Sequence, residues 1–211
     1  SYDSANDVRT DGILIGQQYE SDGVTPVTDA SAEDADPDGP PLNFTKEVNE
    51  LEPNALRQAG GRVGKFPYEL GATPNLNNDF PVFRYADMLL IKAEAIWRST
   101  GDPVNGTALG LVNSVRSRAQ RAGGTLPILT TLDGPVSFNL AGGSVAGGEL
   151  LNERGREMYA ESTRRQDLIR WGLFTTATWW EKDNTDAFRI LFPIPDPQRL
   201  ANANLSQNTG Y

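Results

Sequence analysis

The chain has 211 residues, of which 38% are hydrophobic and 22% are charged, and its net charge at neutral pH is -9. It contains neither cysteine nor histidine, which excludes disulfides, thiol nucleophiles, zinc–thiolate sites and a histidine-based catalytic triad. The acidic balance argues against nucleic acid as a partner, because phosphates call for a basic surface. The sequence has no apolar run of about 18 residues, so we expect no membrane-spanning helix.

Residues 1–79 form an acidic segment that is expected to be loop-rich, with one short strand at 13–15. Asp34, Asp36 and Asp38, followed by Gly39, match the first half of a calcium-binding loop. The twelfth position of that loop, where a bidentate glutamate belongs, is Thr45. The missing ligand favours a solvated acidic loop over a calcium site, and we expect no metal and no cofactor.

Apolar residues recur at steps of three and four along residues 83–99, which is the period of a helix with one buried face. They are Ala86, Leu89, Leu90, Ala93, Ile96 and Trp97. Gly101 and Pro103 follow at the places where helices end. The same period predicts a second helix over residues 105–121, so the two form an antiparallel hairpin. This hairpin is close in length to the 34-residue tetratricopeptide unit.

Residues 123–147 are rich in glycine, serine and threonine and are expected to form a loop with a short strand at 136–138. The longest helix is expected over residues 148–171. Further short helical turns are predicted at 173–180 and 196–203.

The predicted fold class is therefore all-α, with tetratricopeptide-like helical hairpins, a long C-terminal helix and extensive irregular loops. We expect a loop-rich segment, residues 1–79, laid on a helical core formed by residues 80–211.

Seven charged residues of the expected long helix are candidates for ion pairing, because opposite charges such as Glu161 and Arg164, or Arg164 and Asp167, lie three positions apart. They are Glu153, Arg154, Glu157, Glu161, Arg164, Asp167 and Arg170. One hypothesis takes Glu157 and Glu161 as the carboxylate pair of a glycoside hydrolase, which needs two acids about 5–10 Å apart. The other is a structural lattice of ion pairs. We favour the lattice, because pairing with arginine lowers a carboxyl pKa, whereas a proton donor needs a raised one. No catalytic residue is expected.

Aromatic side chains are the other candidates for a binding site, since flat rings pack against the apolar faces of sugars. Trp97 and Trp171 lie at core spacing and are interpreted as packing residues. Trp179 and Trp180 are adjacent, so at least one of them is expected to face solvent. Together with Tyr68, they are the predicted ligand-binding residues.

Four motifs follow one another in the C-terminal two thirds of the chain. They are Arg84-Tyr85-Ala86-Asp87 with Ala93-Glu94-Ala95, then Asn113-x-x-Arg116-x-Arg118-Ala119, then Glu153-Arg154 leading to Asp167-Leu168 and Arg170, and finally Phe192-Pro193-Ile194-Pro195 with Gln207-Asn208-Thr209-Gly210-Tyr211. In this order they resemble the C-terminal portion of the SusD/RagB family, the outer-membrane glycan-binding lipoproteins of Bacteroidetes. The chain departs from the family pattern at Ser162, where the family has glycine, at Gln166, where it has an aromatic residue, and at Thr209, where it has proline.

The resemblance implies a noncatalytic protein of the outer membrane that faces outward and binds oligosaccharides. It also implies a partner, a SusC-like TonB-dependent transporter, and a lipid anchor that this chain does not carry. We therefore expect the chain to be the C-terminal part of a longer protein. Two alternatives stay open: a helical-repeat scaffold that binds protein without sugar affinity, and the glycoside hydrolase considered above.

Overall fold

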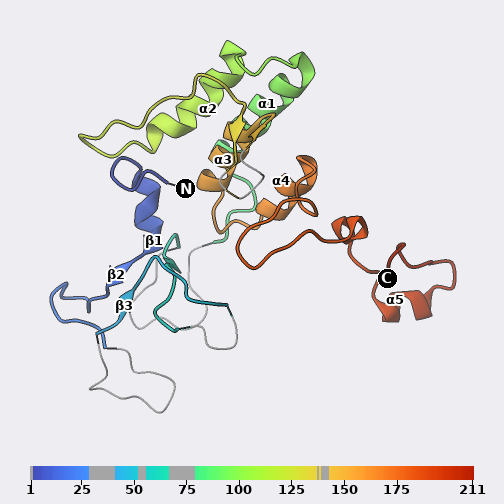
Figure 1. Ribbon diagram of the computed structural model, residues 1–211, viewed down its shortest axis with the longest axis horizontal. Helices are drawn as coiled ribbons and strands as arrows, with labels where there is room; N and C mark the ends of the chain where they lie inside the picture. Colours follow the sequence, from blue (N-terminus) through green and yellow to red (C-terminus); the bar gives the residue numbers. More distant parts are fainter. Residues whose placement is uncertain (1, 29–40, 52–55, 67–78, 137, 139–142) are drawn as a thin grey trace. The chain divides into compact units, whose positions relative to one another are not determined.

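The computed structural model describes residues 2–28, 41–51, 56–66, 79–136, 138 and 143–211 (Figure 1). In these ranges the chain is helix-rich, with five α-helices, two 3-10 helices and six strands of two residues each. The strands form three separate antiparallel pairs. Because of these strands, the all-α class is not confirmed, although helices dominate the regular structure.

The chain divides into two compact units. One comprises Phe83–Ser117 and Pro127–Tyr211, and the other comprises Tyr2–Val82 and Arg118–Leu126. The division at residues 79 and 80 that the sequence indicates stays a prediction about the domains of the protein. The unit that begins at Phe83 contains all five α-helices and both hydrophobic clusters, and it is therefore the one that positions the candidate site.

The predicted hairpin is formed by α1 (Tyr85–Thr100) and α2 (Gly106–Arg118). Helix α1 ends at Gly101, whose φ of 66° lies in the left-handed region that favours glycine. Helix α2 begins after Asn105, whose side-chain oxygen accepts hydrogen bonds from the backbone N–H groups of Thr107 and Ala108, each at 3.1 Å. Local caps therefore set the turn between the two helices.

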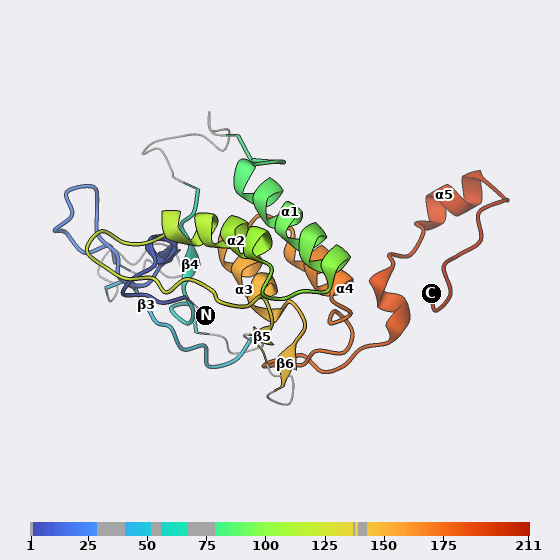
Figure 2. The same cartoon turned by 90° about the horizontal axis from the view of Figure 1, so that it is seen from above.

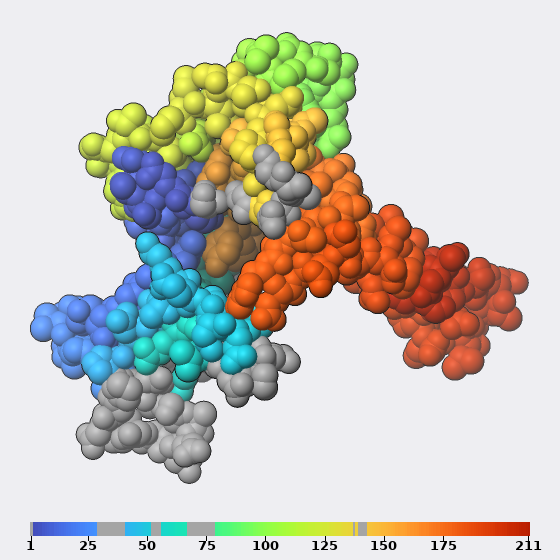
Figure 3. Space-filling model, in the orientation of Figure 1, coloured from blue at the N-terminus to red at the C-terminus, as the bar shows by residue number. Residues whose placement is uncertain are grey.

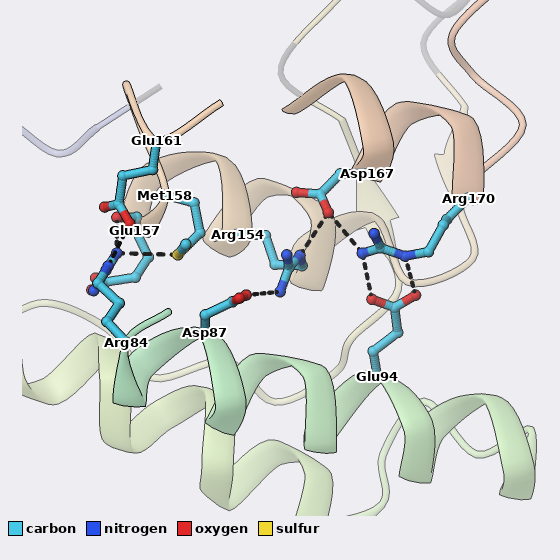
Figure 4. Close-up of polar contacts among 9 residues, drawn as sticks. All are labelled: Arg84, Asp87, Glu94, Arg154, Glu157, Met158, Glu161, Asp167 and Arg170. Carbon is cyan, nitrogen blue, oxygen red and sulfur yellow. Dashed lines mark hydrogen bonds and ion pairs between the residues drawn. The ribbon is translucent and has the colours of Figure 1, made fainter. Parts of the chain in front are cut away.

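The prediction of one long helix over residues 148–171 is wrong, because two helices lie in this range. Helix α3 (Gly148–Glu157) and helix α4 (Arg164–Arg170) are separated by a six-residue break. Within the break, Ala160 and Ser162 have φ values of 62° and 61°. A left-handed residue cannot continue a right-handed helix. The break lets the two helices take different directions, as Figure 4 shows.

The hairpin packs on α3, with α1 against α3 (Figure 2). The fully buried side chains of this cluster come from all three helices and the preceding loop: Leu90, Ala93, Ala108, Val112, Leu132 and Leu150. The rings of Trp97 and Trp171 stack at its edge, with centroids 6.1 Å apart and planes 10° apart. Both tryptophans therefore pack against the core, as predicted. A second cluster joins Leu151 of α3 to Leu168 of α4.

Gly147 allows the close approach of α3 to the hairpin. A Cβ atom on Gly147 would lie 2.6 Å from the ring of Trp97, and its φ of 65° is left-handed. Its N–H donates to a carboxylate oxygen of Asp133 at 2.6 Å. Nearby, β5 (Gly134–Pro135) pairs with β6 (Ser144–Val145). The strand predicted at 136–138 is wrong for its described residues, because β5 ends at Pro135 and neither Val136 nor Phe138 lies in a strand.

After α4 the chain makes turns instead of the helix predicted over 173–180. A 3-10 helix, η2 (Ala187–Ile190), and helix α5 (Asp196–Ala201) follow. Helix α5 falls within the helical turn predicted at 196–203. The tail is tied to the segment before α5, because the hydroxyl of Tyr211 donates to the carbonyl of Leu191 at 2.8 Å.

The other unit contains the 3-10 helix η1 (Val8–Gly12) and two strand pairs. Strand β1 (Ile13–Leu14) pairs with β4 (Arg62–Val63), and β2 (Gly16–Gln17) pairs with β3 (Asn43–Phe44). The strand predicted at 13–15 therefore corresponds to β1. The described residues of this unit are loop-rich, as the composition of residues 1–79 indicates.

Candidate functional site

A network of buried ion pairs joins α1, α3 and α4 (Figure 4). At its centre, Arg154 of α3 donates to Asp167 of α4 at 2.9 Å and to Asp87 of α1 at 3.0 Å. The side chain of Arg154 is 3% exposed and that of Asp167 is 1% exposed. A cation buried this deeply needs carboxylates around it, because desolvating an unpaired charge is costly. One arginine therefore links three helices.

One end of the network is built around Arg84, the residue just before α1. Its Nε donates to Glu161 and its Nη1 donates to Glu157, both at 2.6 Å. Burial disfavours the guanidinium charge, but these two glutamates outweigh it and raise the pKa of Arg84. Arg84 therefore holds the end of α3 and the break after it against the start of α1.

At the other end, Glu94 of α1 accepts two hydrogen bonds from Arg170 of α4, at 3.1 and 2.9 Å. Arg98 adds a third at 2.9 Å. Burial raises the pKa of Glu94, yet the hydrogen bonds from Arg170 and Arg98 outweigh it and lower the pKa below its ordinary value. Arg170 also donates to Asp167 at 2.7 Å, so this end is continuous with the centre.

Glu153 of α3 takes part in a further cluster of ion pairs. It accepts from Arg116 of α2 at 2.9 Å and from Arg156 at 2.9 Å, and its side chain is fully buried. Helix α2 is thus also joined to α3 by an ion pair.

Arg164 is the exception among the seven predicted lattice residues. The interpretation that it pairs with Glu161 and Asp167 is wrong, because it forms no ion pair in the described part of the chain. It donates instead to the carbonyl of Leu151 at 2.9 Å and lies over the ring of Phe138 at 5.6 Å. Burial lowers the pKa of Arg164, and the attraction of Asp167 does not offset it.

The network does not have the geometry of an active site. The side chains of Glu157 and Glu161 are each 2% exposed and both face Arg84. A general acid and a nucleophile must both reach a sugar, and neither carboxylate has an open side. The arrangement can hold helices together, but it offers no surface where a substrate could bind.

Four network partners on α1 or just before it were not identified as such from the sequence: Arg84, Asp87, Glu94 and Arg98. A signal for two of them exists, because Asp87, Leu90, Glu94 and Trp97 follow one another at steps of three and four. All four are buried on one face of α1. Charged residues at core positions of a helix indicate buried partners from another element.

The surface candidate is a tight turn that carries two tryptophans. The backbone N–H of Trp179 donates to the carbonyl of Lys182 at 3.1 Å, and that of Lys182 donates back at 2.9 Å. Trp179 is fixed by an edge contact with Phe138, with centroids 5.8 Å apart, and by Lys182 Nζ at 4.6 Å from its ring. Trp180 lies in the turn, is 51% exposed and contacts no other ring in the described residues. Of the two adjacent tryptophans, Trp180 has the more accessible face.

Two features singled out in the sequence lie outside the described residues. They are Tyr68 and the acidic loop with Asp34, Asp36 and Asp38. Among the residues that are described, no three acidic side chains are grouped as a metal ion would require. In the same ranges no helix has the length and apolar character needed to cross a membrane.

The acids of the ion-pair network are thus buried against arginines, whereas Trp180 is exposed on a surface turn. A sequence profile described as the SusD family matches residues 65–190, more than half of the chain. The chain belongs to the SusD family, and the resemblance seen in its motifs is confirmed.

Two curated relatives are similar in sequence. The starch-binding protein SusD of Bacteroides thetaiotaomicron is 34% identical over 143 residues, which cover 64% of this chain and 22% of that protein. The SusD-like protein P38 of Formosa agariphila is 29% identical over 151 residues, covering 71% of this chain and 28% of that protein. The first of these names describes a binding protein, not an enzyme.

Two solved structures share the fold. A SusD homolog from Bacteroides thetaiotaomicron superposes with a TM-score of 0.52 and 21% identity, over 97% of this chain and 41% of the other. A SusD superfamily protein from Parabacteroides distasonis superposes with a TM-score of 0.50 and 21% identity, over 80% of this chain and 36% of the other. The chain thus spans less than half the length of the relatives that it matches.

Proposed function

We propose that this protein binds oligosaccharides at the outer surface of the cell, without cleaving them, and delivers them to a SusC-like TonB-dependent transporter in the outer membrane. The observation that carries the proposal is the 34% identity to a protein named for starch binding, within a family that the chain shares. The particular glycan is not part of the proposal.

The noncatalytic role is supported by the burial of the acids. Cleaving a glycosidic bond requires two accessible carboxyl groups on either side of the bond. Glu157 and Glu161 are nearly inaccessible and share Arg84. We therefore assign these acids, with the rest of the network, a structural role.

The hairpin of α1 and α2 supports a tetratricopeptide-like body. From Tyr85 to Arg118 it spans 34 residues, the length of one such unit. A single unit cannot bury its hydrophobic face alone. The outer face of α1 leaves Tyr85, Met88 and Ile91 exposed, which is consistent with the greater length of the relatives.

For the binding surface we propose Trp180, with Trp179 as its support and Tyr68 as a further candidate. Trp179 is held by Phe138 and Lys182, so the turn presents Trp180 in a defined position. A ring that is fixed before binding loses little conformational freedom when a sugar stacks on it.

Trp180→Ala tests the binding surface. Removing a large aromatic ring from the centre of a contact is expected to weaken binding about 10-fold or more. Isothermal titration calorimetry against a panel of neutral oligosaccharides measures the change. The matched control is Tyr19→Ala, because Tyr19 is 52% exposed and Trp180 is 51% exposed. The control should bind like the wild type, and equal losses in both variants would contradict the assignment.

The proposal as a whole has a separate test. If the chain, and a longer form extended to the length of the relatives, give no heat with any glycan but bind the transporter, the protein is a scaffold. Release of shortened sugars that disappears in Glu157→Gln would instead make it a hydrolase.

A further inference from the structure

A pocket of about 250 Å³ lies between the turn that carries Trp180 and the C-terminal tail, within a single compact unit. Three of its lining residues are cations, Arg165, Lys182 and Arg189, and three are aromatic, Phe174, Phe192 and Tyr211. These residues belong to the segment coloured orange to red in Figure 3. The pocket brings together side chains that are up to 46 residues apart in the sequence.

The arginine at the base of the pocket is held by rings and carbonyls. The guanidinium of Arg165 lies 4.1 Å from the ring centroid of Phe192 and 4.8 Å from that of Phe174. Its Nη2 donates to the carbonyls of Arg189 and Ile190 at 3.1 and 3.0 Å. These contacts fix the direction of the guanidinium, but they leave its charge without a counterion.

The other two lining cations also have contacts that leave their charge without a counterion. Lys182 donates to the carbonyls of Ala177 and Asp183 and lies over the ring of Trp179. Arg189 lies over the ring of Phe188 at 5.3 Å. Across the described ranges, no Asp or Glu side chain forms an ion pair with any of the three, and none lines the pocket. The side chains that line the pocket therefore carry three positive charges and no negative one.

Such an excess attracts an anion. Cations gathered in a concave surface focus their field on it. Hydrogen bonds between a guanidinium and a carboxylate or sulfate are among the strongest that a protein makes. Pockets for drug-sized ligands measure about 300–1,000 Å³, so a pocket of about 250 Å³ suits one sugar unit better than a whole oligosaccharide. Phe192 is 69% exposed and offers an apolar face for the ring of that unit.

We propose that this pocket binds the anionic group of an acidic sugar unit, a carboxylate or a sulfate ester, within an oligosaccharide ligand. The proposal rests on the function proposed above and specifies its substrate class. Lys182 connects the two sites, because it lines the pocket and closes the turn that carries Trp180. A chain of sugars bound on Trp180 would thus have a charged subsite two residues away along the backbone.

Binding of three probes by the 211-residue chain tests the proposal: trigalacturonate, a sulfated galactan tetrasaccharide and neutral maltotetraose. We expect at least one of the acidic probes to bind more tightly than maltotetraose, and raising the salt concentration to weaken the acidic probe alone. The tighter of the two acidic probes identifies carboxylate or sulfate as the group recognised.

Arg189→Gln is the variant of choice, because the side chain of Arg189 makes no hydrogen bond within the described residues and its loss should leave the fold intact. We expect the ratio of acidic to neutral affinity to fall about 10-fold. The control is Arg199→Gln, because Arg199 lies on α5 and already pairs with Asp196 at 3.0 Å. This control should keep the ratio of the wild type.

The outcomes separate the two proposals. Binding of maltotetraose that is as tight as binding of both acidic probes overturns the acidic subsite and leaves the proposed function intact. An unchanged ratio in Arg189→Gln also overturns the subsite. If none of the three probes binds, the acidic subsite is overturned, whereas the proposed function is decided separately by the glycan panel described above.

Discussion

Two groups of cations in this protein have different surroundings. In the network of α1, α3 and α4, three arginines each donate to two carboxylates: Arg84, Arg154 and Arg170. In the C-terminal pocket, Arg165, Lys182 and Arg189 contact aromatic rings, and the first two donate to backbone carbonyls. The cations of the first group are paired with carboxylates of the protein, whereas those of the second group can pair with the anionic group of a ligand.

The need for internal partners is greatest at the centre of the network, where the side chain of Arg154 is 3% exposed. A charged side chain that is removed from water needs an opposite charge within the fold, so the buried arginine of the network has carboxylate partners. A cation that stays in contact with water is stabilised by hydration. It needs no carboxylate within the fold and can bind the anionic group of a ligand. Charge pairing therefore distinguishes a structural cluster from a binding surface in this chain, and three substitutions can test that distinction.

The largest effect is expected for Arg154→Met. Removing this cation leaves Asp87 and Asp167 buried without their shared partner. Breaking a buried ion pair by deleting one side costs about 3–5 kcal/mol in the free energy of unfolding, which urea unfolding can measure. Arg189→Met is the matched control from the pocket and should change stability by less than about 1 kcal/mol. Comparable losses of stability in both variants would contradict the distinction between a structural network and a pocket with unpaired cations.

A smaller effect, dependent on pH, is expected for Glu94→Gln. The folded-state pKa of Glu94 lies below its ordinary value of 4.5. Its stabilising contribution is therefore present above pH 4.5 and is lost as the pH falls through the folded-state pKa. At pH 7 the variant should be less stable by about 1–2 kcal/mol, because Arg98 and Arg170 remain partly hydrated.

Below pH 4.5, the stability of Glu94→Gln should fall less steeply than that of the wild type. Thermal unfolding between pH 3 and pH 7 measures both curves. Asp196→Asn, from an exposed pair on α5, serves as the control. Parallel curves for Glu94→Gln and the wild type would mean that Glu94 contributes nothing to the pH dependence.

The smallest effect is expected for Arg164→Met. Burial lowers the pKa of Arg164, so its charge is less stable in the folded protein than in the unfolded chain. Methionine removes this desolvation cost but also the hydrogen bond to Leu151. The two changes oppose each other, so stability should shift by less than about 1 kcal/mol. A loss as large as that of Arg154→Met would show that Arg164 belongs to the ion-pair network after all.

The hairpin of α1 and α2 could be predicted because its signals are local. The spacing of apolar residues and the glycine after Thr100 act on helical turns only a few residues away in the sequence. Helix α5 also carries a local signal, since Pro197 stands in its first turn, where proline is tolerated.

The break between α3 and α4 could not be predicted from the period of the sequence. The pattern of charged and apolar residues continues from Gly148 to Trp171, and Ala160 is a good helix former. One signal was present: the family has glycine where this chain has Ser162, and Ser162 adopts a φ of 61°. Glycine enters the left-handed region without steric cost, so the family pattern marks the break even though this sequence does not.

The pairing of charges shows the same limit. Spacing along one helix suggested partners three or four residues apart, such as Glu161 with Arg164. The structure pairs Glu161 with Arg84, 77 residues away. Once the helix breaks after Glu157, the side chains on either side no longer share a face, and Glu161 pairs with the residue just before α1.

The sequence by itself determined the family, the hairpin and the presence of a charged, buried seam, because motif order, caps and apolar period are local properties of the chain. Only the tertiary structure decided which carboxylate each arginine meets and which cations meet none. Those choices depend on distances between elements and on burial, and neither is encoded within a single helix. The same physical reason makes the pocket invisible in the sequence, where Arg165, Lys182 and Arg189 are simply three of nineteen basic residues.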